Sequence, residues 1–383
     1  MAERDFTAHN AEVKECWEAY RAGRPYRVPI SWGINPRLWL LDPALNTRGI
    51  TFREYFEDPE TALQVQVRHQ NYVRHQVIQD AEMGLPEAWS AYPDFQNCCE
   101  AMWFGCKLHY CEGNVPDTEP MLCGEHRDLL FDRGLPDPLG GVMAENIRRW
   151  EYLKGRRDQG FEYRGRPLGE VGLAMGGTDG PFTAGCNLRG TTQLCLDLYE
   201  DPDYVRRLLG FICEATIARL RAWRRFMGQP ERSAGWGFAD DSIALLSVEM
   251  YREFVLPVHR RLVAAFAETG PNSIHLCGDA TRHFPLLRAE LDITSFDTGF
   301  PVDFAWLRRT LGPQVEIHGG PHVEVLRGGT PELVRAETRR ILESGIMEGG
   351  RFHLREGNNL APCTPLANIA ACYPAGREWG RYH

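Results

Sequence analysis

The chain has 383 residues, of which 43% are hydrophobic and 25% charged, a composition typical of globular proteins and not of disordered or fibrous ones. Its net charge of -9 argues against non-specific nucleic-acid binding, which depends on a basic surface. The apolar runs are too short to cross a bilayer, and residues 1–15 lack the apolar core of a secretory signal. We therefore expect a cytoplasmic protein without membrane or nucleic-acid partners, whose 12 cysteines are reduced.

The first 150 residues are rich in aromatic side chains and show no regular alternation of elements. A strand-like segment at residues 26–32 precedes a predicted helix at residues 59–79. Residues 98–111 then hold four cysteines and His109. Their spacing lacks the paired pattern of a zinc module, and aromatic neighbours indicate a packed segment. A wall of the substrate pocket and a second metal site are the alternatives.

From about residue 168, short apolar strands alternate with longer amphipathic helices. The predicted strands are 170–175, 233–238, 273–277, 293–296, 315–319 and 352–354, and the predicted helices are 203–227, 247–268, 281–290, 303–311 and 331–344. This alternation indicates parallel β-α-β units, which fit a closed barrel or an open doubly wound sheet. No glycine-rich dinucleotide motif follows an early strand, and polar residues follow the strand ends. We therefore predict an α/β protein with a TIM (β/α)8 barrel. It is one domain over 1–383, with residues 1–150 as an N-terminal extension and 151–383 as the barrel core.

In such a barrel the chemistry lies at the carboxyl ends of the strands. Asp240, Asp241 and Glu356 follow predicted strands, so each is a candidate to approach a metal, orient a substrate or take a proton. Asp240 and Asp241 fit a helix N-cap equally well.

Three further residues are candidates for contact with the substrate. They are Asn359, His318 and Trp236. The alternatives are turn chemistry for the asparagine and an ordinary core position for the histidine and the tryptophan.

The strongest chemical signal is the segment Ile274-His275-Leu276-Cys277-Gly278. Residues i and i+2 of a strand point to the same side, so the imidazole and the thiol project together. Cys363 follows a later predicted strand and is suited to be a third ligand. One histidine and two cysteines suit zinc, and three ligands leave a position open, as in catalytic sites. The alternative is that His275 and Cys277 are core residues at a strand end.

Several motifs in this order resemble the uroporphyrinogen decarboxylase superfamily, whose fold is the same barrel. They are GPFTAGCNLRG at 180–190, the stretch 240–262, HLCGD at 275–279, the helix start at 328–332 and APCTPLANIAA at 361–371. The true decarboxylases carry an N-terminal Met-Arg-Gln-Ala-Gly-Arg signature, which is missing here. They also carry Gly-His-Gly where this chain has Glu356-Gly357-Asn358. The cobalamin-linked methyltransferases of the same superfamily bind zinc through His-x-Cys and a distant Cys, a pattern that His275, Cys277 and Cys363 match.

The resemblance implies a zinc-dependent methyltransferase that moves a methyl group between a small methylated substrate or a thiol and a corrinoid. No Asp-x-His-x-x-Gly cobalamin-binding motif occurs in the sequence, so the corrinoid is expected on a separate corrinoid protein or free in solution. One alternative is a metal-free decarboxylase like uroporphyrinogen decarboxylase. The other is a relative without catalysis that binds a corrinoid or a partner.

Overall fold

The computed structural model describes residues 5–173 and 176–382. The chain divides into two compact units that interleave along the sequence. Unit 1 comprises Met1–Ala91, Leu153–Gly172 and Ser295–His383, and unit 2 comprises Tyr92–Tyr152 and Leu173–Thr294. The expected division into an extension (1–150) and a barrel core (151–383) remains a prediction.

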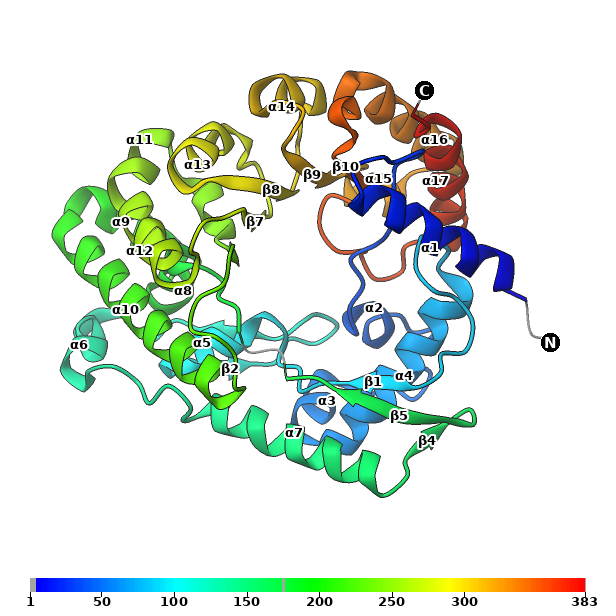
Figure 1. Ribbon diagram of the computed structural model, residues 1–383. Helices are drawn as coiled ribbons and strands as arrows, with labels where there is room; N and C mark the ends of the chain where they lie inside the picture. Colours follow the sequence, from blue (N-terminus) through cyan, green and yellow to red (C-terminus); the bar gives the residue numbers. More distant parts are fainter. Residues whose placement is uncertain (1–4, 174–175, 383) are drawn as a thin grey trace. The chain divides into compact units, whose positions relative to one another are not determined.

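Unit 1 is built mainly from helices of both ends of the chain (Figure 1). They are α1 (Thr7–Arg21), α2 (Arg37–Leu40), α3 (Phe52–Glu57), α4 (Pro59–Gln76), α14 (Phe304–Leu311), α15 (Val323–Gly328), α16 (Pro331–Ile341) and α17 (Leu366–Trp379). α4 begins sharply because the Asp58 carboxylate accepts hydrogen bonds from the first-turn amides and Pro59 takes the first position. Its buried face packs Leu63 and Val67 against Trp89 and Leu168.

Two sheets belong to unit 1. The parallel strands β8 (Ile293–Thr298), β9 (Glu316–Gly319) and β10 (Phe352–Leu354) pair in that order, with β8 in unit 1 from Ser295 onward. A smaller sheet has the order β1 (Trp89–Ala91), β5 (Arg166–Val171) and β4 (Glu162–Tyr163). Residues 26–32 run beside β10 through an Ile30–Leu354 bridge and form no longer ladder, since Pro29 has no amide proton to donate.

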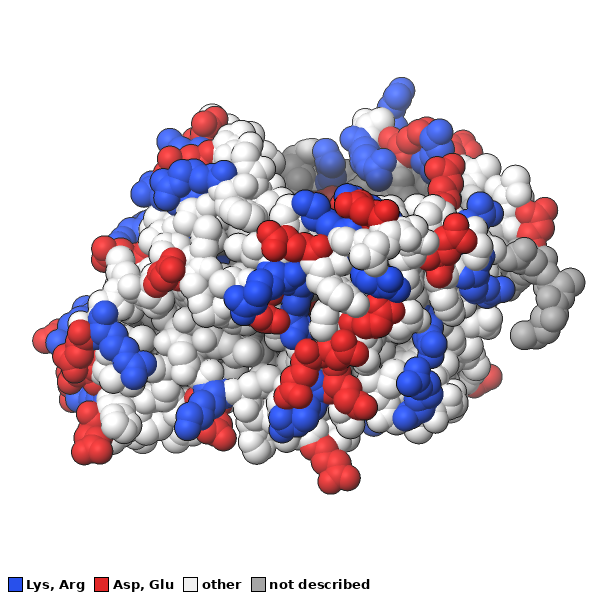
Figure 2. Space-filling model, turned by 90° about the horizontal axis from the view of Figure 1, so that it is seen from below, with Lys and Arg blue, Asp and Glu red and all other residues white. Residues whose placement is uncertain are grey.

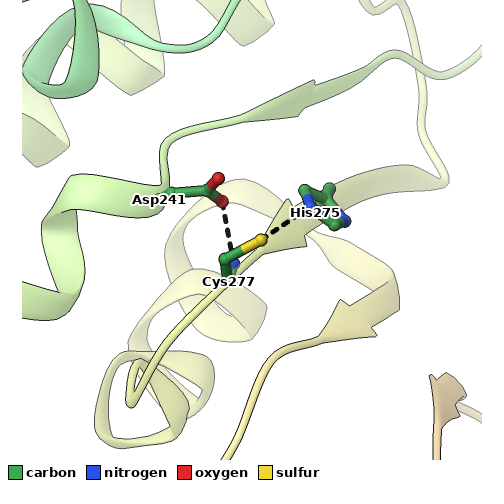
Figure 3. Close-up of side chains that lie close together, drawn as sticks. All are labelled: Asp241, His275 and Cys277. Atoms are coloured by element: carbon green, nitrogen blue, oxygen red, sulfur yellow. Dashed lines mark hydrogen bonds between the residues drawn. The ribbon is translucent and has the colours of Figure 1, made fainter. Parts of the chain in front are cut away.

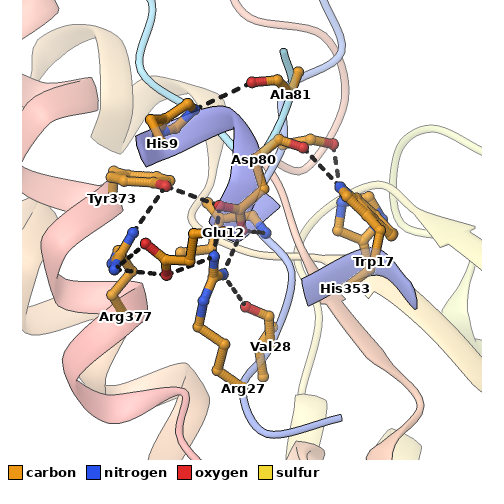
Figure 4. Close-up of polar contacts among 12 residues, drawn as sticks. His9, Glu12, Trp17, Arg27, Val28, Asp80, Ala81, His353, Tyr373 and Arg377 are labelled. Carbon is orange, nitrogen blue, oxygen red and sulfur yellow. Dashed lines mark hydrogen bonds and ion pairs between the residues drawn. The ribbon is translucent and has the colours of Figure 1, made fainter. Parts of the chain in front are cut away.

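The two ends of the chain meet in unit 1 around a buried ion pair (Figure 4). The Arg27 guanidinium donates to both carboxylate oxygens of Asp80, at 2.5 and 2.9 Å. Tyr373 of α17 donates to the same carboxylate at 2.8 Å, and Trp17 of α1 donates to the Asp80 carbonyl at 2.7 Å. Asp80 therefore fastens α17 and the 26–32 segment through its carboxylate and α1 through its backbone carbonyl.

Unit 2 contains the remaining helices. They are α5 (Cys99–Phe104), α6 (Leu129–Arg133), most of α7 (Val142–Asp158), α8 (Pro181–Arg189), α9 (Thr191–Glu200), α10 (Pro202–Phe226), α11 (Val248–Met250), α12 (Leu256–Phe266) and α13 (Phe284–Leu291). Strands β2 (Lys107–His109) and β3 (Asp117–Glu119) are antiparallel. β6 (Gly237–Ala239) and β7 (Asn272–Leu276) are parallel, with Ala239 paired to His275. This register places the residues that follow β6 beside the end of β7.

The helices and strands largely follow the predicted pattern, with local differences in two strands and one helix. The predicted strand 233–238 is reduced to Gly237–Ala239, and the predicted strand 170–175 ends at Val171, with residues 174–175 outside the described part of the chain. The predicted helix 247–268 is interrupted by a π-helical turn at Tyr251–Val255. Pro257 follows this turn and cannot donate the next backbone hydrogen bond, which accounts for the irregularity.

In the described part of the chain, no helix is both long and apolar enough to span a membrane. On the face drawn in Figure 2, basic and acidic side chains are interspersed. This mixture agrees with the net charge of -9 and differs from the basic stripe of a nucleic-acid-binding surface.

Candidate active site

Unit 2 brings Asp241, His275 and Cys277 together at the carboxyl ends of β6 and β7 (Figure 3). His275 Nε2 lies 3.2 Å from Cys277 Sγ, and the Cys277 amide donates to Asp241 Oδ1 at 2.8 Å. One ligand atom from each side chain lies within 4.8 Å of the other two, and all three residues are half-buried. Among the described residues, this is the one group of at least three such side chains with metal-binding spacing. We call it the metal cluster.

Local sequence explains this geometry. His275 and Cys277 are two residues apart at the end of β7, so their side chains share one side of the chain. Gly278 follows with a φ of +69°, a left-handed conformation that glycine adopts without strain. Asp241 opens a short 3-10 turn directly after β6.

The donor atoms of the metal cluster are an imidazole nitrogen, a thiol sulfur and a carboxylate oxygen. Zinc binds all three types, so the donor set fits the predicted metal. Burial raises the pKa of the Cys277 thiol, and its contact with His275 partly offsets the rise. His275 and Cys277 thus lie close together, as the sequence predicts, whereas their role as metal ligands remains a prediction.

Cys363 belongs to unit 1 and is exposed. Its Sγ lies 3.8 Å from the Leu41 carbonyl oxygen. Its φ is +61°, an uncommon conformation for a residue with a side chain, and such positions concentrate at functional sites. Its role as a third ligand remains a prediction.

Asp240 is fully buried and acts within unit 2. Its carboxylate accepts hydrogen bonds from the Phe182 amide at 3.1 Å, from the Thr183 amide at 2.8 Å and from the Thr183 hydroxyl at 2.8 Å. It also lies 2.8 Å from His259 Nε2. Asp240 thus accepts from the first amides of a helix, as the N-cap alternative expects. The helix is α8, which lies far from Asp240 in the sequence. The nearby helix start at Val248 is capped by Ser247 instead.

Glu356 is fully buried in unit 1, at the end of β10. The Gly33 amide donates to its two oxygens at 2.9 and 3.1 Å, and Arg355 donates at 2.9 Å. A Cβ at Gly33 would lie 2.6 Å from Glu356 Oε1, so this close approach favours glycine. Burial raises the pKa of Glu356 to about 7, although Arg355 opposes the rise.

The three predicted substrate-contact residues lie in different surroundings. His318 lies 3.2 Å from Glu316, and this contact is the main cause that lowers the pKa of the Glu316 carboxyl group to about 2. Asn359 donates to the Asn358 side chain at 3.4 Å. Trp236 is buried in unit 2, stacked on Phe238 with ring centroids 5.2 Å apart. Contact of these residues with a substrate remains a prediction.

Two contacts were missed by sequence reasoning. His259 of α12 lies between Asp240 and the Tyr251 hydroxyl, and Glu100 of α5 is buried against Arg219. Both are polar residues within helical patterns, where periodicity alone gives no sign of a partner. In the 98–111 segment, the thiol of buried Cys98 donates to the Pro116 carbonyl and His109 lies 3.8 Å from Glu119. Cys99 lines a cavity, and a role of this segment as a wall of the substrate pocket remains a prediction.

A comparison with protein families decides the relationship of the chain. The family model for uroporphyrinogen decarboxylase (URO-D) matches residues 27–379. The chain belongs to the uroporphyrinogen decarboxylase family.

The relatives of this family member include methyltransferases and decarboxylases. It is 29% identical over 298 residues to the methylated-thiol–coenzyme M methyltransferase of Methanosarcina mazei, covering 76% of this chain and 72% of the relative. It is 26% identical to a methylcobamide:CoM methyltransferase of the same organism, covering 51% of this chain and 55% of the relative. The uroporphyrinogen decarboxylase of Syntrophotalea carbinolica is 28% identical, covering 52% of this chain and 57% of the relative.

A solved methyltransferase from Methanosarcina mazei has the same fold as this chain. The TM-score is 0.63 at 18% identity, and the match covers 96% of this chain and 98% of the other. The fold of the family is the TIM barrel, so the predicted fold class and the predicted superfamily are confirmed. The chain is thus an enzyme of the uroporphyrinogen decarboxylase superfamily with methyltransferase homologues.

Proposed function

We propose that this protein is a zinc-dependent methyltransferase that exchanges a methyl group with a corrinoid carrier. The observation that carries the proposal is the metal cluster of Asp241, His275 and Cys277 at the carboxyl ends of β6 and β7. Relatives named as methylated-thiol and methylcobamide methyltransferases support the reaction class. The carrier is either a separate corrinoid protein or free corrinoid, and the small-molecule partner is a methyl donor or a thiol acceptor.

His275 and Cys277 would hold the metal, with Cys363 as a third ligand and Asp241 as an exchangeable fourth. When bound, zinc would polarise the methylated heteroatom of a donor or keep an acceptor thiol deprotonated. The Cys277 amide holds one Asp241 oxygen in place, which leaves the other oxygen able to orient a substrate or take its proton. Glu356 is a further group able to hold or release a proton near neutral pH.

The second candidate function is a decarboxylase that needs no metal. The family match and the decarboxylase relatives favour it. The missing N-terminal signature and the Glu356-Gly357-Asn358 sequence count against it. A decarboxylase predicts turnover that is unchanged by removal of the metal.

Metal content and methyl transfer together test the proposed function. Wild-type protein should contain about one zinc per chain, and Cys277→Ser and Cys363→Ala should each lose most of it, because a thiolate ligand is removed. Methyl transfer between methylcobalamin and a small thiol, followed by the absorbance of the corrinoid, should fall at least about a hundredfold in Cys277→Ser.

Cys123→Ser is the matched control, since Cys123 is exposed, as Cys363 is, and its thiol donates to the nearby Pro120 carbonyl. It should keep both metal and turnover. Full activity in a metal-free Cys277→Ser protein would contradict the proposal. So would wild-type protein that takes up no zinc under reducing conditions.

A further inference from the structure

Unit 2 contains a cavity of about 240 Å³ that the proposed function does not use. It is lined by Gln96, Cys99, Glu100, Met143, Gly177, Thr178, Asp179 and Arg219. Gly177 is exposed, so the cavity has an opening to solvent, whereas Glu100, Met143 and Arg219 form a buried floor. Because one water occupies about 30 Å³ in the liquid, the space suits a small organic molecule.

The charges of the floor are already compensated. Arg219 donates to Glu100 at 2.6 Å and to the Gly177 carbonyl at 3.0 Å. Glu100 also accepts hydrogen bonds from the Thr178 hydroxyl, at 2.9 and 3.0 Å to its two oxygens, from the Asp179 amide at 2.8 Å and from the Thr216 hydroxyl at 3.4 Å. Arg219 is therefore committed to a carboxylate of the protein and is poorly placed to receive an anionic ligand.

The Asp179 carboxyl group carries the remaining charge. Within the described part of the chain, no hydrogen bond or ion pair reaches this carboxyl group, although it is half-buried in the cavity wall. Burial and the negative charge of Glu100 raise its pKa to about 7. The neighbouring Cys99 thiol stays neutral, because burial raises its pKa to about 11. The cavity thus offers one uncompensated acidic group beside the sulfur atoms of Cys99 and Met143.

The cavity lies next to the loop that leads to the metal cluster. Gly180 follows Asp179 and packs so closely on the end of β6 that an added Cβ would lie 2.3 Å from the Ala239 carbonyl oxygen. The Thr183 hydroxyl accepts a hydrogen bond from the Ser242 amide at 2.9 Å. Asp241 is among the charges that raise the pKa of Asp179. A ligand in the cavity would therefore be close to the metal cluster within the same unit.

We propose that this cavity binds a small alkylammonium ion through Asp179. An N–H group of the cation would donate to the carboxylate and restore the charge balance, and its alkyl groups would pack against Met143 and Cys99. A sulfonate or carboxylate would meet an uncompensated carboxylate and is disfavoured. The inference rests on the proposed function only in taking this cation as the small-molecule substrate class of the methyltransferase. Binding itself does not depend on turnover.

Isothermal titration calorimetry on the full chain tests the proposal with three probes of similar size. They are dimethylammonium, the neutral propan-2-ol and the anionic methanesulfonate. In wild-type protein, dimethylammonium should bind at least about tenfold more tightly than either of the others. This ranking needs no variant. Asp179→Asn should reduce dimethylammonium affinity about tenfold or more, while Asp179→Glu, which keeps the charge, should retain binding.

Asp203→Asn is the control, since Asp203 is an acidic residue with 92% of its side chain exposed. It should bind dimethylammonium as wild type does. Equal affinity for the cation and the alcohol, tighter binding of the sulfonate, or an unchanged affinity in Asp179→Asn would overturn the proposal. Zinc content measured on the same samples separates the two ideas. Cation binding without zinc refutes only the proposed function, and zinc without cation binding refutes only this inference.

Discussion

Glu356 shows how burial alone changes the behaviour of one side chain. It is fully buried, and the desolvation of its charged form raises its pKa from 4.5 to about 7. Two donors, the Gly33 amide and Arg355, stabilise the carboxylate but do not cancel that cost. The residue is thus poised to exchange a proton near neutral pH, as a general acid or base requires.

The pH dependence of stability measures this shift. Between pH 4.5 and about 7 the folded chain keeps a proton that the unfolded chain has released, so the contribution of Glu356 to the free energy of unfolding falls as pH rises. The full effect is roughly 3 kcal/mol. Urea denaturation at pH 4.5 and pH 8 measures the free energy of unfolding of wild type and Glu356→Gln. From the lower to the higher pH, the variant should become more stable relative to wild type by about this amount.

All other titrating groups are common to both proteins, so their effects cancel in the comparison. Parallel stability profiles for wild type and Glu356→Gln would show that the pKa of Glu356 is not raised. Wild type that gains on the variant as pH rises would show a shift of the opposite sign.

The contacts of Asp240 connect three elements of unit 2. The residue directly follows β6. Its carboxylate accepts hydrogen bonds from the first amides of α8 and pairs with His259 of α12. The free amides at a helix start require such acceptors, and here the acceptor comes from about 60 residues away in sequence. Asp240 therefore fixes the loop before α8, and with it the wall of the cavity at Asp179.

Replacement of Asp240 separates its capping contacts from a chemical role. Asp240→Ala should lower the free energy of unfolding by about 3 kcal/mol, because it leaves buried donors without an acceptor. Asp240→Asn keeps an acceptor oxygen and should lose less. Urea denaturation gives both values. A folded Asp240→Asn protein without methyl-transfer activity would assign Asp240 to the chemistry as well, whereas an unperturbed Asp240→Ala protein would contradict the capping assignment.

Helices are predicted best where the hydrophobic periodicity agrees with residues that typically start or end a helix. α10 was predicted as 203–227 and observed as Pro202–Phe226, because an amphipathic pattern with a proline near its start fixes both ends. The helix around Pro257 was less predictable. Pro257 has no amide proton, and the surrounding packing decides how the helix adapts to that loss. The hydrophobic pattern of the segment therefore does not predict the π-helical turn.

The buried Arg27–Asp80 pair acts at the scale of the whole chain. Within unit 1 it connects the N-terminal helix, through the contact of Arg27 with Glu12, to the 26–32 segment and the C-terminal helix (Figure 4). Both side chains are almost completely buried, at 3% and 0% exposed. Either charge buried without its partner would destabilise the fold, so each side chain requires the other.

A double-mutant cycle tests this role. Asp80→Leu should lower the free energy of unfolding by about 3 to 5 kcal/mol, because Arg27 is left buried without its partner. Arg27→Met combined with Asp80→Leu should lose less than Asp80→Leu alone, since no isolated charge remains. Glu57→Gln, which breaks the exposed Arg53–Glu57 pair, should change stability by less than about 1 kcal/mol. Additive losses at positions 27 and 80 in urea denaturation would refute the coupling.

The sequence by itself determined the alternation of strands and helices, the superfamily and the proximity of His275 and Cys277. These features depend on local spacing, since periodicity and an i, i+2 relation on a strand are properties of a short stretch of chain. The tertiary structure decided that Asp241 joins this pair, that Asp240 caps α8 and that Glu356 is buried at Gly33. It also decided that Arg219 neutralises Glu100 and not Asp179. Each of these depends on strand register or on burial among segments far apart in sequence, where no local pattern names the partner.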